Sequence, residues 1–214
     1  MCTSYLIRMT KVCVVIGVGP GLGLACVRKW ASQGYHVAMI CRNAGKLASV
    51  ETASSVKAFS ADVTDPEGLT AVLKQVEAAM GEVDTVVYNC GMAVWANYLS
   101  VTHEKLDMSF KTQVGGLLTV AQHLGPKMAK RGQGCIAVTG APAALRGRPM
   151  TPAFAASKAA QRMMVRHSLS QCTVFTYYYT FYILIINIRF FSWPKIPKSY
   201  SKFSFRQKYQ HKRF

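Results

Sequence analysis

Five short apolar segments, separated by stretches with helical spacing, constrain the fold of this chain more than any other feature. Their Val, Ile and Cys residues run with little alternation, as in strands that are buried on both faces. Helical connections between such strands imply parallel pairing, because parallel strands need a long crossover. We therefore expect a parallel sheet with strands over residues 11–17, 35–41, 56–63, 83–89 and 135–141.

The connecting segments predict helices that pack on this sheet. Asp65 is expected as the N-cap and Pro66 as the first residue of a helix that stops at Gly81. This order of elements predicts an α/β fold with a doubly wound parallel sheet of the Rossmann type, whose ligand lies outside the carboxyl ends of the strands. Further helices are expected over residues 24–34, around 43–53, over about 102–129 and over about 152–170.

A glycine-rich turn, "GVGPGLG", follows the first predicted strand. Its spacing is G-x-x-x-G-x-G, with Gly17, Gly21 and Gly23 in the three positions and Leu22 between the last two. Glycines let the backbone approach a pyrophosphate, and the next helix directs its first N–H groups at that anion. We expect these four residues to bind a dinucleotide; the alternative is a turn that is merely tight.

Four motifs together make the chain resemble the short-chain dehydrogenase/reductases over about residues 11–171. The first is the glycine-rich turn, and the second is "ADV", whose Asp62 and Val63 flank the adenine in that family. The third is "YNCG", with Asn89 and Gly91 kept from the pattern N-N-A-G, and the fourth is "VTGAPAALRGRPMTPAFAASKAA". The resemblance implies an oxidoreductase that binds a nicotinamide dinucleotide and a small carbonyl or alcohol substrate.

The charge after the second strand bears on which dinucleotide is bound. A carboxylate there would bind the ribose hydroxyls of NAD(H) and repel a 2′-phosphate, but the sequence has Cys41, Arg42 and Asn43. The guanidinium of Arg42 can pair with that phosphate. We therefore expect NADP(H) in preference to NAD(H); the alternative is that Arg42 is a solvated loop charge.

The resemblance implies a catalytic set of Asn, Ser, Tyr and Lys, of which this chain keeps one member. Lys158 is present, and in the family it also binds the nicotinamide ribose. Phe154 stands at the Tyr position, Ala141 (or its neighbour, residue 142) at the Ser position, and Gln113 at the Asn position, which in the family supports a water that relays the proton.

These substitutions remove the usual proton donor. Phe154 has nothing to donate, and Thr139 lies about 6.5–7 Å from Ala141 along the strand, which is too far for its hydroxyl to replace a Ser hydroxyl. General acid–base catalysis typically contributes about 10²–10⁴-fold. We expect cofactor binding with weak or absent activity, a pseudoenzyme; the alternative is a catalytically silent nucleotide-binding or interaction protein.

The last 43 residues differ in character from the rest. The formal net charge is +17; residues 1–171 account for +9, and residues 172–214 carry eight Lys and Arg and no acid. No sixth strand is evident there, so we expect a domain over 1–171 that is truncated relative to the family. Three interpretations of 172–214 stay open: a membrane contact through residues 174–191, a basic–aromatic nucleic-acid segment, and a replaced C-terminus.

Composition narrows the partners and the compartment. The seven Cys residues are scattered without a C-x-x-C motif, which favours reduced thiols in a cytoplasmic protein and no metal site. Because much of the excess charge lies in one segment, we expect no nucleic-acid partner for the folded part. A homo-oligomer is compatible with this sequence.

Overall fold

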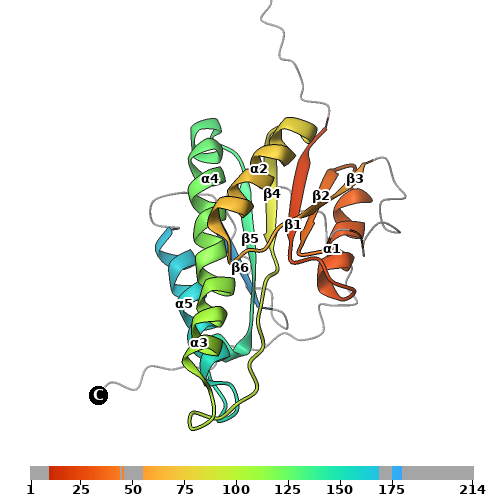
Figure 1. Cartoon of the computed structure of the whole chain (residues 1–214). Helices are drawn as coiled ribbons and strands as arrows, with labels where there is room; N and C mark the ends of the chain where they lie inside the picture. The colour runs from red at the N-terminus through yellow and green to blue at the C-terminus, as the bar shows by residue number, and fades with distance from the viewer. Residues whose placement is uncertain (1–9, 44, 46–54, 169–174, 180–214) are drawn as a thin grey trace, which may run out of the picture.

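The computed structural model describes residues 10–43, 45, 55–168 and 175–179. Its strands form one parallel sheet in the order β3-β2-β1-β4-β5-β6, with helices on both faces (Figure 1). This confirms the doubly wound parallel sheet. The strands are β1 (Val12–Ile16), β2 (His36–Cys41), β3 (Val56–Ser60), β4 (Val83–Tyr88), β5 (Cys135–Gly140) and β6 (Phe175–Tyr179).

The helices are α1 (Leu22–Ala31), α2 (Pro66–Met80), α3 (His103–Phe110), α4 (Gly116–Arg131) and α5 (Pro152–Ser168). Between α3 and α4 the backbone forms a π-helical turn, Lys111–Gly115, and a 3-10 turn, Pro142–Ala144, follows β5. The long helical stretch expected over 102–129 is confirmed, since α3, the π turn and α4 follow one another without a break. The helix predicted around 43–53 lies almost entirely outside the described residues.

Alternate residues of β1 belong to two hydrophobic cores. Val14 and Ile16 pack with residues of α2 and α4, whereas Cys13 and Val15 pack with Val27 and other residues of α1. A strand that is buried on both faces needs apolar residues at every position, which explains the run "VCVVI" with no exposed member. The two cores place α1 on one face of the sheet and α2 and α4 on the other (Figure 1).

The signals predicted for α2 are confirmed. The side chain of Asp65 accepts a hydrogen bond from the Gly68 N–H at 3.1 Å, and Pro66 begins the helix. Gly81 ends it with φ +93°, a conformation that favours glycine. Local sequence chemistry therefore sets both ends of this helix.

The expectation that no sixth strand follows the last helix was wrong. β6 pairs with β5 in parallel, from Ile136↔Phe175 to Gly140↔Tyr179. Its sequence, "FTYYY", is rich in aromatic residues, which suit strands, but it has no flanking turn signal. The sheet thus continues past residue 171, and β5 is an interior strand.

The remaining interpretations of the C-terminal segment fall outside the structure. Of residues 174–191, only those of β6 are described, and residues 180–214 lie outside the described residues. Among the helices that the structure describes, none has the length and apolar character needed to cross a membrane.

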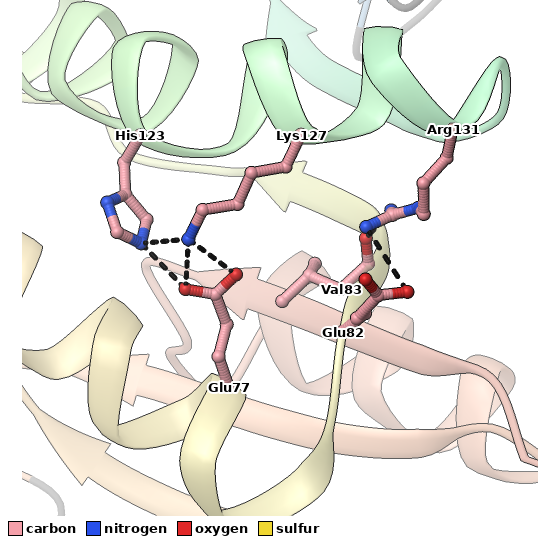
Figure 2. A network of polar contacts seen from close by, with 6 residues as sticks. All are labelled: Glu77, Glu82, Val83, His123, Lys127 and Arg131. Carbon is pink, nitrogen blue, oxygen red and sulfur yellow. Dashed lines mark hydrogen bonds and ion pairs between the residues drawn. The ribbon is translucent and has the colours of Figure 1, made fainter.

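An ion-pair network joins α2 to α4 (Figure 2). The carboxylate of Glu77 accepts hydrogen bonds from Lys127 Nζ at 2.7 and 2.8 Å, and its Oε2 lies 2.8 Å from His123 Nε2. Nearby, Arg131 donates to the Val83 carbonyl at 2.7 Å. Burial acts to raise the pKa of Glu77, but the hydrogen bonds and charges of Lys127 and His123 outweigh it, so that this pKa is lowered.

Glu77→Gln is expected to lower the free energy of unfolding by about 1 kcal/mol near neutral pH, a modest loss because the Lys127 side chain is 45% exposed. The folded pKa lies below the unfolded value, so the contribution is present above about pH 4.3 and is lost as pH falls through the folded pKa. Urea unfolding of both proteins at about pH 7 and about pH 3 measures this. An equal loss at both pH values would contradict the charge-based explanation.

Candidate nucleotide-binding site

The glycine-rich turn between β1 and α1 contains two positions that only glycine fits. Gly17 has φ +85°, and a Cβ there would lie 2.8 Å from the Asn89 carbonyl oxygen. A Cβ on Gly23 would lie 2.8 Å from both the Gly17 oxygen and the Val18 Cα. These glycines let β1, the turn and α1 pack closely against the end of β4.

The outer part of the same turn is open. A Cβ at Gly19 or Gly21 would meet no described atom within 4 Å. Gly21 is the N-cap of α1, no side chain among the described residues caps this helix, and its first turn has no acidic residue. The exposed Leu22 begins the helix. An uncapped helix N-terminus beside a bare backbone turn suits a phosphate.

Asn89, just after β4, connects this turn to the end of that strand. The Asn89 side-chain amide donates to the Gly17 carbonyl at 3.0 Å, and its backbone N–H donates to the Ile16 carbonyl at 2.8 Å. Asn89 therefore holds the shape of the turn with its side chain. A Cβ at Gly91 would lie 3.9 Å from Lys158 Cε and Nζ, an ordinary van der Waals distance, so Gly91 lies beside the lysine side chain.

Arg42, Asp62 and Val63 lie at the carboxyl ends of β2 and β3. Asp62 accepts hydrogen bonds from the Thr64 N–H at 2.9 Å and the Thr64 hydroxyl at 2.7 Å. These bonds lower the pKa of Asp62, and the charge of Arg42 adds a smaller effect in the same direction. The two predicted adenine-side residues and the arginine thus lie along one edge of the sheet with the glycine-rich turn.

Lys158 projects from α5 into the protein between the ends of β4 and β5. Its Nζ donates to the Thr139 carbonyl at 2.9 Å, the Cys90 carbonyl at 3.4 Å and the Gln161 Oε1 at 2.9 Å. Only 3% of the residue is exposed, and burial lowers the pKa of its ammonium to about 8. Lys158 is the polar centre of the site.

Gln113 lies in the π turn and is fully buried. Its Nε2 donates to the hydroxyls of Ser109 at 2.8 Å and Ser157 at 2.6 Å, and its Oε1 has no partner among the described residues. Its backbone carbonyl accepts from Gln161 Nε2 at 2.7 Å. The structure therefore brings the backbone of Gln113, and not its side chain, into connection with Lys158.

The remaining two catalytic positions offer no proton donor. Phe154 is partly buried on α5, and its backbone carbonyl accepts from the Ser157 hydroxyl at 3.1 Å. Ala141 is extended backbone just after β5. The hydroxyl of Thr139 donates to the Tyr88 carbonyl at 3.4 Å, so it points toward β4.

Sequence reasoning missed Ser109, Ser157 and Gln161, all of them fully buried. Gln161 could have been suspected because it follows Lys158 by three residues, a spacing that brings side chains together on a helix. The pairing of Ser109 with Ser157, with oxygens 2.8 Å apart, joins α3 to α5 across 48 positions, and no local pattern predicts it.

Comparison with known proteins agrees with the family that the sequence motifs indicate. The family model described as short chain dehydrogenase matches residues 11–173. The chain is 30% identical over 166 residues to oxidoreductase asL5 of Sarocladium schorii, covering 76% of this chain and 67% of the relative. It is 31% identical over 163 residues to 2,3-dihydro-2,3-dihydroxybenzoate dehydrogenase of Bacillus subtilis, covering 73% of this chain and 62% of the relative.

Solved structures show the same fold. A short-chain dehydrogenase from Streptomyces avermitilis superposes with a TM-score of 0.76 at 25% identity, covering 79% of this chain and 64% of that one. A Tyr-to-Phe variant of ElxO with NADPH bound superposes with a TM-score of 0.71 at 20% identity, covering 76% and 68%. The chain thus spans about two thirds of the length of the proteins that it matches.

Proposed function

Because the chain belongs to the short chain dehydrogenase family, we propose that it binds NADP(H) and, with its present side chains, reduces carbonyl compounds weakly or not at all. The observation that carries the proposal is the buried ammonium of Lys158 at the same sheet edge as the glycine-rich turn, with Phe154 on the same helix. When bound, NADPH supplies a hydride. A suitable acid must supply the proton to the carbonyl oxygen.

The residues present fit the dinucleotide. Gly17 and Gly23 are packed tightly while Gly19 and Gly21 are open, so the turn has a rigid inner side and a bare outer side. We expect the pyrophosphate on that outer side at the N-terminus of α1, the adenine near Asp62 and Val63, and the nicotinamide ribose near Lys158. This assignment is tested by titrating the protein with NADPH and following the fluorescence of the nicotinamide.

The expected preference for NADPH over NADH depends on Arg42. The chain has no acid next to Arg42 in "CRN" that would repel a 2′-phosphate, and the ElxO variant with the same fold has NADPH bound, which supports the preference. Arg42→Ala is expected to weaken NADPH binding about tenfold or more, as for loss of a charge-assisted hydrogen bond, and to leave NADH binding unchanged. Parallel titrations with both nucleotides measure this; an equal loss for both would mean that Arg42 does not contact the 2′-phosphate.

Weak turnover follows from the side chains at the catalytic positions. Lys158 can hold a nucleotide without a proton donor, but Phe154 and Ala141 cannot protonate or position a carbonyl oxygen. The second candidate is a protein that binds the nucleotide and signals its presence to a partner without turnover, which the same two substitutions favour. Steady-state NADPH oxidation with an activated aldehyde, 4-nitrobenzaldehyde, separates the two: turnover above the protein-free rate supports the enzyme.

A further inference from the structure

The side chain of Gln161 connects two parts of the site that no other hydrogen bond described above joins directly. It is fully buried on α5. Its Oε1 accepts from Lys158 Nζ at 2.9 Å, and its Nε2 donates to the backbone carbonyl of Gln113 at 2.7 Å. The oxygen of this amide therefore binds the lysine, and its nitrogen binds the π turn.

The π turn makes the Gln113 carbonyl available. In a π-helical turn the backbone bond runs from residue i+5 to residue i, as from the Gly116 N–H to the Lys111 carbonyl, and this wider spacing leaves carbonyls for outside donors. The Thr112 carbonyl accepts from the Tyr88 hydroxyl at 2.5 Å, and the Gln113 carbonyl accepts from Gln161. Both bonds tie this turn to neighbouring elements, β4 and α5.

The other end of the Gln161 amide is one of the acceptors around Lys158. An ammonium has three N–H donors, and Lys158 Nζ faces three oxygens, those of Thr139, Cys90 and Gln161. Two of the three are backbone carbonyls at the ends of strands, so Gln161 is the only side chain among these acceptors. A buried charge is tolerated when such acceptors replace its lost hydration.

We propose that Gln161 is a positioning residue for Lys158, holding the ammonium at the sheet edge and supporting its charge through the side-chain oxygen. The titratable group that bears most directly on Lys158 is Cys90, whose pKa burial raises to about 12, so the thiol is neutral near pH 7. The Gln161 amide also fills the place between Lys158 and the Gln113 carbonyl. A carboxamide has no acidic proton to transfer, so the Gln161 side chain does not relay a proton between Lys158 and the Gln113 carbonyl.

The test measures Lys158 directly, in the full chain without nucleotide. The ¹⁵Nζ resonance of Lys158, assigned by its loss in Lys158→Met, is followed with pH in the wild type, Gln161→Met and Gln161→Glu. Gln161→Met keeps the volume and removes the acceptor, so the pKa of Lys158 is expected to fall by about 1. Gln161→Glu places a carboxylate at the acceptor position and is expected to raise the pKa.

The shift in Gln161→Met distinguishes positioning from packing. This variant also loses the donor to the Gln113 carbonyl, so a purely structural role would destabilise it and leave the pKa of Lys158 unmoved, which would overturn the proposal. A carboxylate in Gln161→Glu raises that pKa through its charge in either case, so this variant checks that the side chain at 161 reaches the ammonium. Gln122→Met, at an exposed position on α4, is the matched control. It is expected to change neither the stability of the protein nor the pKa of Lys158. If Gln161→Met does not fold, as judged by circular dichroism, Gln161→Leu, which also removes the acceptor, is measured in its place and is expected to lower the pKa of Lys158.

The consequence for nucleotide binding rests on the proposed function. If Lys158 contacts the cofactor, Gln161→Met is expected to weaken NADPH binding more at about pH 8 than at about pH 6. With its lowered pKa, Lys158 of the variant is largely neutral at about pH 8 but still charged at about pH 6. A wild type that does not bind NADPH would refute the proposed function and leave the resonance test intact. Equal weakening at both pH values would contradict the link from Gln161 through Lys158 to the cofactor.

Discussion

Gly17→Ala is expected to lower the free energy of unfolding by about 2–5 kcal/mol and to abolish measurable NADPH binding. Two costs add at this position. The backbone has φ +85°, which costs an L-residue about 1–2 kcal/mol. The new methyl would lie 2.8–2.9 Å from the Asn89 carbonyl and the Cys90 sulfur, and overpacking of this kind costs about 1–3 kcal/mol.

The loss of binding has a separate cause from the loss of stability. The Gly17 carbonyl accepts from the Asn89 side chain, and the Gly17 N–H donates to the Ile40 carbonyl at 2.9 Å. Moving the backbone to relieve the contact with Asn89 therefore disturbs the turn where we expect the pyrophosphate. Urea unfolding measures the first effect, and NADPH titration under conditions where the variant is still folded measures the second.

Gly19→Ala is the matched control for stability, because it lies in the same turn and its Cβ would meet no described atom within 4 Å. We expect its free energy of unfolding to lie within about 0.5 kcal/mol of the wild type. If Gly17→Ala is as stable as Gly19→Ala, the close approach of the turn to the end of β4 is not what requires glycine.

Phe154→Tyr combined with Ala141→Ser is expected to raise NADPH-dependent reduction of 4-nitrobenzaldehyde by about 10²–10⁴-fold over the wild type. The tyrosine places a phenolic O–H on α5 one turn before Lys158, and the serine adds a hydroxyl at the end of β5. The ammonium of Lys158 favours ionisation of a nearby phenol and so makes it a better acid. Phe154→Tyr alone is expected to gain less, because nothing then positions the carbonyl oxygen.

Initial rates of NADPH absorbance loss measure the gain, and NADPH titration of each variant confirms that binding has not changed. Adding Lys158→Met to the double variant is the control and should return the rate to that of the wild type. A double variant that binds NADPH but stays at the wild-type rate would contradict the view that the two missing hydroxyls limit turnover.

Much of the fold is predictable because its signals are local. The apolar run of β1, the cap of α2 by Asp65 and the stop at Gly81 each depend on a few neighbouring residues, and each is where the pattern predicts. The glycine spacing likewise identifies the turn whose inner positions, Gly17 and Gly23, admit no Cβ. Local patterns of this kind predict whether a segment forms a strand, a helix end or a turn, because they depend on neighbouring residues and not on distant contacts.

The rest depends on contacts between residues far apart in the chain. "FTYYY" becomes β6 by pairing with β5, whose residues lie far earlier in the chain. Gln113 turns its amide to Ser157, 44 positions away, and leaves its carbonyl to Gln161, 48 positions away. The sequence by itself determined the doubly wound sheet and the place of the glycine-rich turn, whereas the tertiary structure alone decided which groups surround Lys158. The physical reason is that a buried polar group loses its hydrogen bonds to water and must bond to another group of the protein. Which donor or acceptor lies within reach depends on how elements far apart in the chain pack together.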